Sequence, residues 1–208
     1  LGSAGWTGSL FAHLRENPVT GEVEYHDGSG LVWRLYPAER GATPCRDAYW
    51  SLPGSYDPTP QGSYCVPRGF YYELARLGGG GWRLSDRNGG TRYFDSEGRL
   101  TEISDRHRQA QAAGAQGSTI SFSYDGLGQL VMVEDDLGRR THLEYYLDPR
   151  PSGEGGDGVS YGLLKRITDF AGRSVEYSFD DHRRLTQVLL PEAGNPVEDY
   201  DAYSYTEQ

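Results

Sequence analysis

Aspartates recur at turn-like positions in this chain, and paired carboxylates can act as general acid and base or bind calcium. Each of them is followed three residues later by a glycine. Aspartate at the start of a turn bonds the backbone two residues on, and glycine supplies the unusual dihedral that such turns need. We therefore interpret these residues as structural turns of a repeat. The turn residues are Asp95, Gly98, Asp125, Gly128, Asp135, Gly138, Asp169 and Gly172.

The other residues capable of chemistry do not form a recognisable site. The histidines show no helical metal-binding spacing and stand beside no nucleophile motif, so we expect them to face solvent in strands or turns. The run LGGGGW lacks the Lys-Ser/Thr ending of a phosphate loop, and no EF-hand spacing is present. We expect no catalytic residue, no cofactor and no metal ion, and hence no enzyme. The histidines are His13, His26, His107, His142 and His182.

Two cysteines leave an alternative open. Cys45 and Cys65 lie in one proline-rich stretch. They fit one disulfide in an oxidising compartment or two ordinary thiols in the cytosol. A disulfide would close a loop of about 20 residues, which the chain-entropy model values at roughly 3 kcal/mol.

The tryptophans also allow two interpretations. Together they can form a sugar-stacking platform, or they can fill the core of a tyrosine-rich sheet, which we favour. They are Trp6, Trp33, Trp50 and Trp82.

Composition favours strands and excludes several partners. The 208 residues include 29 Gly, 11 Pro and 16 Tyr but only 6 Phe, which disfavours long helices. A net charge of −10 disfavours nucleic acid and anionic membranes as partners. No apolar run reaches the roughly 18 residues that cross a bilayer, so we expect no membrane insertion by this segment. Because the only Met is Met132, we interpret the chain as a piece of a longer protein.

The elements that position these residues are short strands between turn signals. Residues 1–68 read as a β segment that precedes the repeats; it contains the hairpin turn HDGSG and, over 37–68, a long proline-rich loop. Residues 69–208 alternate strands and short turns, as in an antiparallel sheet. We expect this second sheet to continue from the first segment and to be truncated at its C-terminal end.

A phrase repeats through the second part. Its frame is aromatic-Asp-x-x-Gly-x-Leu-x-x-Ile/Val-x-Asp-x-x-Gly-Arg, and Asp95 recurs as Asp125, 30 residues further on. Self-similarity at such a period marks a repeat architecture. The spacing of Leu130 and Val133 places them on opposite faces of a flat strand, so either a bulge or a strand buried on both faces is required. Arg183 replaces the turn glycine in the last full unit.

The phrases SYDGLGQL, DDLGRR, DFAGRS and YSFDDHRRL resemble those of the Rhs, or YD-repeat, family. The opening LGSAGWTGSLFAHL and EYHDGSGLVWRLY resemble the segment that precedes the repeats in bacterial Rhs proteins. The resemblance implies an all-β fold, an antiparallel β-meander of YD repeats forming part of a spiralling β-sheet ribbon or shell. In bacterial toxin complexes and polymorphic toxins that shell encloses a C-terminal toxic domain, and teneurins use a related barrel in adhesion. No motif of the family's self-cleaving region is present, so no catalytic residue carries over.

Two functions follow from this resemblance. The first is a non-catalytic structural part of an Rhs/YD-repeat shell that encloses or presents a C-terminal toxin or effector. Its partners would be the rest of the parent chain, the enclosed domain and proteins of a delivery apparatus. The alternative is an extracellular or cell-wall-associated module for adhesion or glycan binding, contacting its ligand through the tryptophans and the loops at 37–68 and 147–160. Either implies secretion or display at a bacterial cell surface as part of a larger exported protein.

Overall fold

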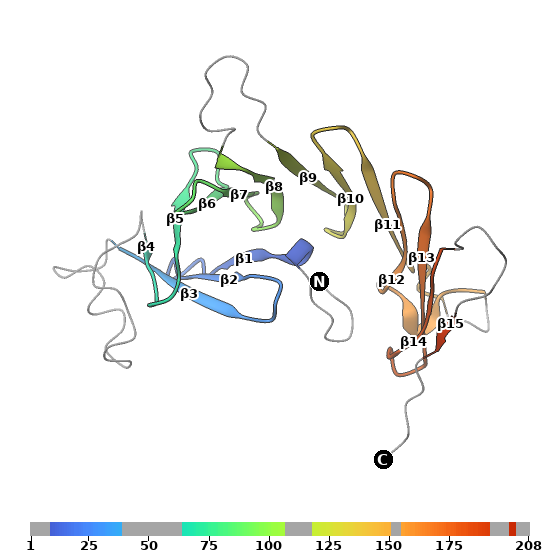
Figure 1. Ribbon diagram of the computed structural model, residues 1–208. Coiled ribbons are helices and arrows are strands. Elements are labelled where there is room, and N and C mark those ends of the chain that lie inside the picture. Colours follow the sequence, from blue (N-terminus) through green and yellow to red (C-terminus); the bar gives the residue numbers. More distant parts are fainter. Residues whose placement is uncertain (1–8, 39–63, 107–117, 151–154, 192–199, 203–208) are drawn as a thin grey trace. The chain divides into compact units, whose positions relative to one another are not determined.

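The computed structural model describes residues 9–38, 64–106, 118–150, 155–191 and 200–202 (Figure 1). Within these ranges the structure is built from antiparallel strands, with two short 3-10 helices, η2 (Ser9–Phe11) and η5 (Gly158–Ser160). The all-β antiparallel fold predicted from the sequence is therefore confirmed. The described part of the chain contains no helix long and apolar enough to cross a membrane.

The described residues belong to two compact units, which we call the N-terminal unit (Thr7–Ser121) and the C-terminal unit (Phe122–Gln208). In the N-terminal unit the first sheet has four strands in chain order: β1 (His13–Glu16), β2 (Val23–His26), β3 (Val32–Pro37) and β4 (Tyr64–Cys65). A second run pairs each strand with its neighbour in the chain. Its strands are β5 (Tyr72–Arg76), β6 (Trp82–Asp86), β7 (Thr91–Phe94), β8 (Leu100–Ser104) and the first half of β9 (Thr119–Tyr124).

The first sheet confirms one expected hairpin and corrects one expected loop. β2 and β3 pair across the HDGSG turn, where the Asp27 carboxylate accepts the amide of Ser29 at 2.8 Å. The stretch 37–68, expected to be irregular, contributes β4, in which Cys65 pairs with Tyr36. A short strand is invisible to sequence patterning because two residues show no alternation. Residues 39–63 of the predicted loop lie outside the described residues.

The core of the N-terminal unit lies between its two sheets. Tyr25 of β2 makes edge contacts with Phe70, Tyr72 and Phe94, at ring-centroid distances of 6.1, 6.4 and 6.2 Å. Edge-to-face aromatic pairs of this kind add to the free energy gained by burying their area. The fully buried leucines of both sheets complete the core: Leu14, Leu35, Leu74, Leu84 and Leu100.

The tryptophans described by the structure belong to this core. Trp82 is 2% exposed, and its register partner on β7 is Phe94. Trp33 is half-buried and lies 5.4 Å from the Phe70 ring. The preference for a core role is thus confirmed for these two, while Trp6 and Trp50 lie outside the described residues.

The C-terminal unit continues the meander with one apolar and one charged face. Cross-strand partners Leu143, Ile167 and Val175 lie on one face of the sheet. The next residues in register form a charged row on the other face, where Arg166 reaches Glu144 at 3.5 Å and Glu176 at 2.8 Å. The strands are β10 (Leu130–Asp135), β11 (Arg140–Tyr145), β12 (Leu164–Thr168), β13 (Ser174–Phe179), β14 (Leu185–Leu189) and β15 (Tyr200–Ala202).

A bulge explains the odd spacing between a leucine and the next isoleucine or valine in three repeats. On β8, Leu100 pairs with Phe94 and Ile103 with Arg92, so Thr101 is the extra residue. Because Phe94 and Arg92 are two positions apart on β7, Leu100 and Ile103 point to the same face. The Thr101 hydroxyl donates to the carbonyl of Tyr93 at 3.1 Å.

The same bulge recurs between β13 and β14. Leu185 pairs with Phe179 and Gln187 with Ser178, which leaves Thr186 as the extra residue. Its hydroxyl donates to the Ser178 carbonyl at 3.1 Å.

On β12, Leu164 pairs with Tyr145 and Arg166 with Glu144, so Lys165 is the extra residue. Of the two possibilities the spacing allowed, the bulge is the one found in these repeats.

Candidate functional site

The turn between β7 and β8 is closed by an aspartate and the arginine four residues later. Asp95 Oδ1 accepts the amides of Glu97 at 3.0 Å and Arg99 at 2.9 Å, and Oδ2 accepts Arg99 Nε at 2.8 Å. Two backbone hydrogen bonds, from Asp95 to Arg99 and from Gly98 to Asp95, complete the loop. Gly98 has φ +80°, a conformation that glycine adopts without steric cost. We call this five-residue arrangement the Asp–Arg clasp.

The clasp recurs in the C-terminal unit. Arg139 Nε donates to Asp135 Oδ2 at 2.6 Å, and Arg173 Nε donates to Asp169 Oδ2 at 2.7 Å. In the turn that starts at Asp125 the fifth residue is Gln129, whose amide bonds Asp125 Oδ1 at 2.9 Å. The sequence-predicted turn residues therefore lie in four separate hairpin turns, and their carboxylates do not converge on a common site. Gly128, Gly138 and Gly172 also have positive φ, at 78°, 75° and 81°.

A further clasp lies in the last full unit, where the sequence places Arg183 at the position of the turn glycine. Asp180 Oδ2 accepts Arg184 Nε at 2.7 Å, and Arg183 takes the left-handed conformation with φ 64°. Its guanidinium donates to the carbonyls of Val159 at 2.6 Å and Tyr161 at 3.2 Å. The aspartate four residues before an arginine was the signal available in the sequence.

Two of the clasp carboxylates, Asp135 and Asp169, are unsuited to donate a proton near neutral pH. The hydrogen bond from Arg139 holds the pKa of Asp135 below its usual value, and Arg173 does the same for Asp169. These carboxylates therefore stay ionised near neutral pH, when a general acid must hold a proton. Within the described ranges, no group of three or more His, Cys, Asp or Glu side chains is placed to hold a metal ion.

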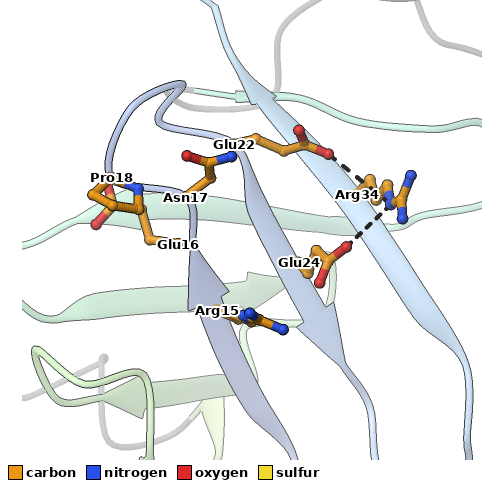
Figure 2. Close-up of a pocket in the computed structure, with 7 residues that line it drawn as sticks. All are labelled: Arg15, Glu16, Asn17, Pro18, Glu22, Glu24 and Arg34. Carbon is orange, nitrogen blue, oxygen red and sulfur yellow. Dashed lines mark hydrogen bonds and ion pairs between the residues drawn. The ribbon is translucent and has the colours of Figure 1, made fainter.

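A polar pocket of about 510 Å³ lies beside β1, β2 and β3 (Figure 2). Its carboxylates are paired: Arg34 Nε lies 3.2 Å from Glu24 Oε1 and 4.0 Å from Glu22 Oε1, and Glu16 contacts Arg76. Because carboxylates and guanidinium groups compensate one another there, the pocket presents no uncompensated charge cluster. Its lining residues are Arg15, Glu16, Asn17, Pro18, Glu22, Glu24 and Arg34.

Two histidines differ from the expectation that all face solvent. His13 and His26 are register partners on β1 and β2, and their rings stack with centroids 4.2 Å apart. The spacing about the β1–β2 turn was the signal, since an antiparallel hairpin centred there brings these positions opposite each other. His142 and His182 are exposed. His107 lies outside the described residues.

Cys65 is 1% exposed and is bonded in a disulfide rather than free. Cys45 lies outside the described residues, so the pairing of the two stays a prediction. Cys65 belongs to the first sheet of the N-terminal unit through its register partner Tyr36.

Comparison with known proteins gives matches in structure alone. No protein-family model and no curated protein matches the chain. Among 23 matching chains of solved structures is one from the crystal structure of TcdB2–TccC3–Cdc42, at 15% identity and a TM-score of 0.42. The match covers 88% of this chain and 9% of that chain, so the chain spans about a tenth of the length of the solved chain. We draw neither function nor partner from this likeness.

Proposed function

We propose that this chain is a non-catalytic structural part of an Rhs/YD-repeat shell that encloses or presents a C-terminal toxin or effector. The observation that carries the proposal is the Asp–Arg clasp, which closes hairpins in both units with the same hydrogen bonds. Each clasp uses only residues within its own turn. A ribbon of any length can therefore grow by adding hairpins, without new long-range contacts at each addition.

The two faces of the C-terminal unit support the same function. A wall that separates an interior from solvent needs faces of different chemistry. The row Leu143, Ile167 and Val175 and the charged row through Arg166 provide such a difference within one sheet. Adding strands to the ribbon also covers strand edges, which otherwise recruit other chains and aggregate.

The partners and location follow from this role. The ribbon would join the rest of its parent chain, enclose the toxin or effector domain and meet the proteins of a delivery apparatus. The parent protein would be exported and would act in the secreted or cell-surface space of a bacterium.

The test uses the full-length parent protein, purified under native conditions and treated with a protease before and after denaturation. The expected result is a C-terminal polypeptide, identified by intact mass, that co-elutes with the shell and is cleaved by the protease only after denaturation. The proposal would be overturned if the protease digested the C-terminal region of the native parent as fast as that of the denatured parent, and if no C-terminal polypeptide co-eluted with the shell. That result would favour the adhesion module, which predicts binding to immobilised glycans that is lost in the Trp50→Ala variant.

A further inference from the structure

The stacked imidazoles of His13 and His26 form an unusual pair inside the N-terminal unit. Their ring centroids are 4.2 Å apart and their planes differ by 9°. His13 Nδ1 lies 3.0 Å from the carbonyl of Phe11, which can only accept, so Nδ1 carries the proton. His26 Nε2 is buried and has no hydrogen-bond partner among the described residues.

This pair lies where the first sheet meets the first Asp–Arg clasp. The backbone of His13 forms an isolated bridge with Arg99, and the amide of Leu14 donates to the carbonyl of Gly98 at 2.8 Å. Gly98 is buried, and a methyl group on it would overlap the carbonyl of Leu14. The histidine pair is therefore adjacent to the contact that joins β1 to the β7–β8 turn.

The charges around the pair accommodate one added proton better than two. Glu24 Oε2 lies 3.8 Å from His26 Nε2 and can meet a positive charge there. On β1 the nearby charge is the cation Arg15, and across the junction it is Arg99, which already pairs with Asp95 at 2.8 Å. Asp27, next to His26, is engaged with Ser29, and the β3 partner of His26 is the uncharged Val32.

We propose that the His13–His26 pair is a pH-sensitive latch, which holds β1 against the β7–β8 turn at neutral pH and releases it when both imidazoles are protonated. Two imidazolium rings stacked at this distance repel each other in a partly buried site. The pKa of His13 supports this, because burial lowers it from the ordinary 6.5 and the His26 ring adds to the effect. The hydrogen bond to Phe11 opposes that lowering. The latch does not depend on the proposed shell function.

The sign of the pH effect follows from linkage. A base whose pKa is lowered by folding binds fewer protons in the folded state than in the unfolded one. Its contribution to stability is present above pH 6.5 and is lost as the pH falls through the folded-state pKa. Acidification should therefore open the junction locally.

The test measures hydrogen exchange of the Leu14 amide by NMR in the full 208-residue chain, as protection factors between about pH 7.5 and 5.0. We expect the protection of Leu14 to fall over this range, because the folded state binds fewer protons at His13 than the unfolded state does. The Asp169 amide, which bonds the Arg173 carbonyl at 2.9 Å, should keep its protection factor.

Variants separate the latch from general acid sensitivity. His13→Gln and His26→Gln should each leave less than a twofold fall at Leu14, and the exposed-histidine controls His142→Gln and His182→Gln should retain the full fall. Should a pair variant not fold, the imidazole resonances of the unmodified chain decide, because coupled rings titrate in two separated steps. A protection factor at Leu14 that is independent of pH, or a single titration step for the pair, would overturn the latch.

Discussion

The amide of Leu14 bonds the carbonyl of Gly98 at 2.8 Å, and this contact attaches the first sheet to the first repeat turn of the N-terminal unit. Gly98 therefore has two tasks, because it supplies the positive φ of its turn and leaves room for the Leu14 carbonyl. The corresponding glycine of a later clasp, Gly138, has only the first task, since open space surrounds its Cβ position.

This difference predicts unequal costs for the same substitution. Gly138→Ala should lower the free energy of unfolding by about 1 kcal/mol, the cost of a left-handed alanine. Gly98→Ala adds steric overlap with backbone and should cost about 3 kcal/mol or more. Urea unfolding of both variants, with Gly172→Ala as a second open-space control, checks the prediction. Equal losses at Gly98 and Gly138 would contradict it.

The Asp–Arg clasp predicts a defined acid sensitivity. The pKa of Asp135 is held below 3.8 by its hydrogen bond from Arg139, so its contribution to stability is present above that value and is lost as pH falls below it. Asp135→Asn should reduce the loss of stability on acidification. The neighbouring Asp136→Asn, which changes the same charge outside the clasp, should leave the profile unaltered. Urea midpoints measured across the acid range test this, and matching profiles for the two variants would argue against the clasp.

The bulge threonines should matter through their hydroxyl groups. Thr101→Val and Thr186→Val each remove a hydrogen bond of 3.1 Å to a backbone carbonyl, and each should cost about 1 kcal/mol. Thr141→Val on β11 is the matched control, and we expect it to be neutral because valine suits strands equally well. Thr101→Ser, which keeps the hydroxyl, should retain most of the free energy of unfolding that Thr101→Val loses. Chemical denaturation provides the measurement. A Thr101→Val variant with an unchanged free energy of unfolding would show that the bulge hydroxyl does not stabilise the protein.

Tyr25 predicts the behaviour of the N-terminal unit in alkali. Burial raises the pKa of Tyr25 to about 12, so its contribution to stability is complete below pH 10 and is lost as pH rises toward that value. Tyr25→Phe should therefore make the unit less sensitive to alkali while keeping the ring contacts with Phe70 and Phe94. Near-ultraviolet circular dichroism followed through an alkaline titration tests this. If the alkaline transition were unchanged in the variant, groups other than the Tyr25 hydroxyl would cause the alkali sensitivity of the unit.

The sequence predicts the local part of this structure well, for a physical reason. The residues that close the hairpin between Asp95 and Arg99 all lie within one turn. Because each such turn can be recognised in the sequence, the order of the strands and their antiparallel pairing can be predicted from the succession of turns. The bulge at Thr101 was one of two solutions that the spacing of apolar residues allowed, and only packing against β7 selects between them.

Contacts between segments distant in the chain were not predictable in the same way. The His13–His26 stack requires the register of β1 on β2, and the Leu14–Gly98 bond requires the placement of one sheet on another. The histidine pair left only the spacing about the β1–β2 turn as a signal. The Leu14–Gly98 bond left none, because a single long-range contact has no spacing to repeat. Arg183 was recognised at the position of the turn glycine, but the closure of its turn by Asp180 and Arg184 was not predicted.

Within a clasp, some side chains close the turn and others between them do not take part in the closure. Its closure uses the aspartate, the fourth residue and the fifth, whereas a side chain between them, that of Leu137, is 74% exposed. Mutations at these tips cost the hairpin little, so natural selection can alter them without endangering the scaffold. Related chains can therefore diverge at their turn tips and acquire new specificities while inheriting the same framework.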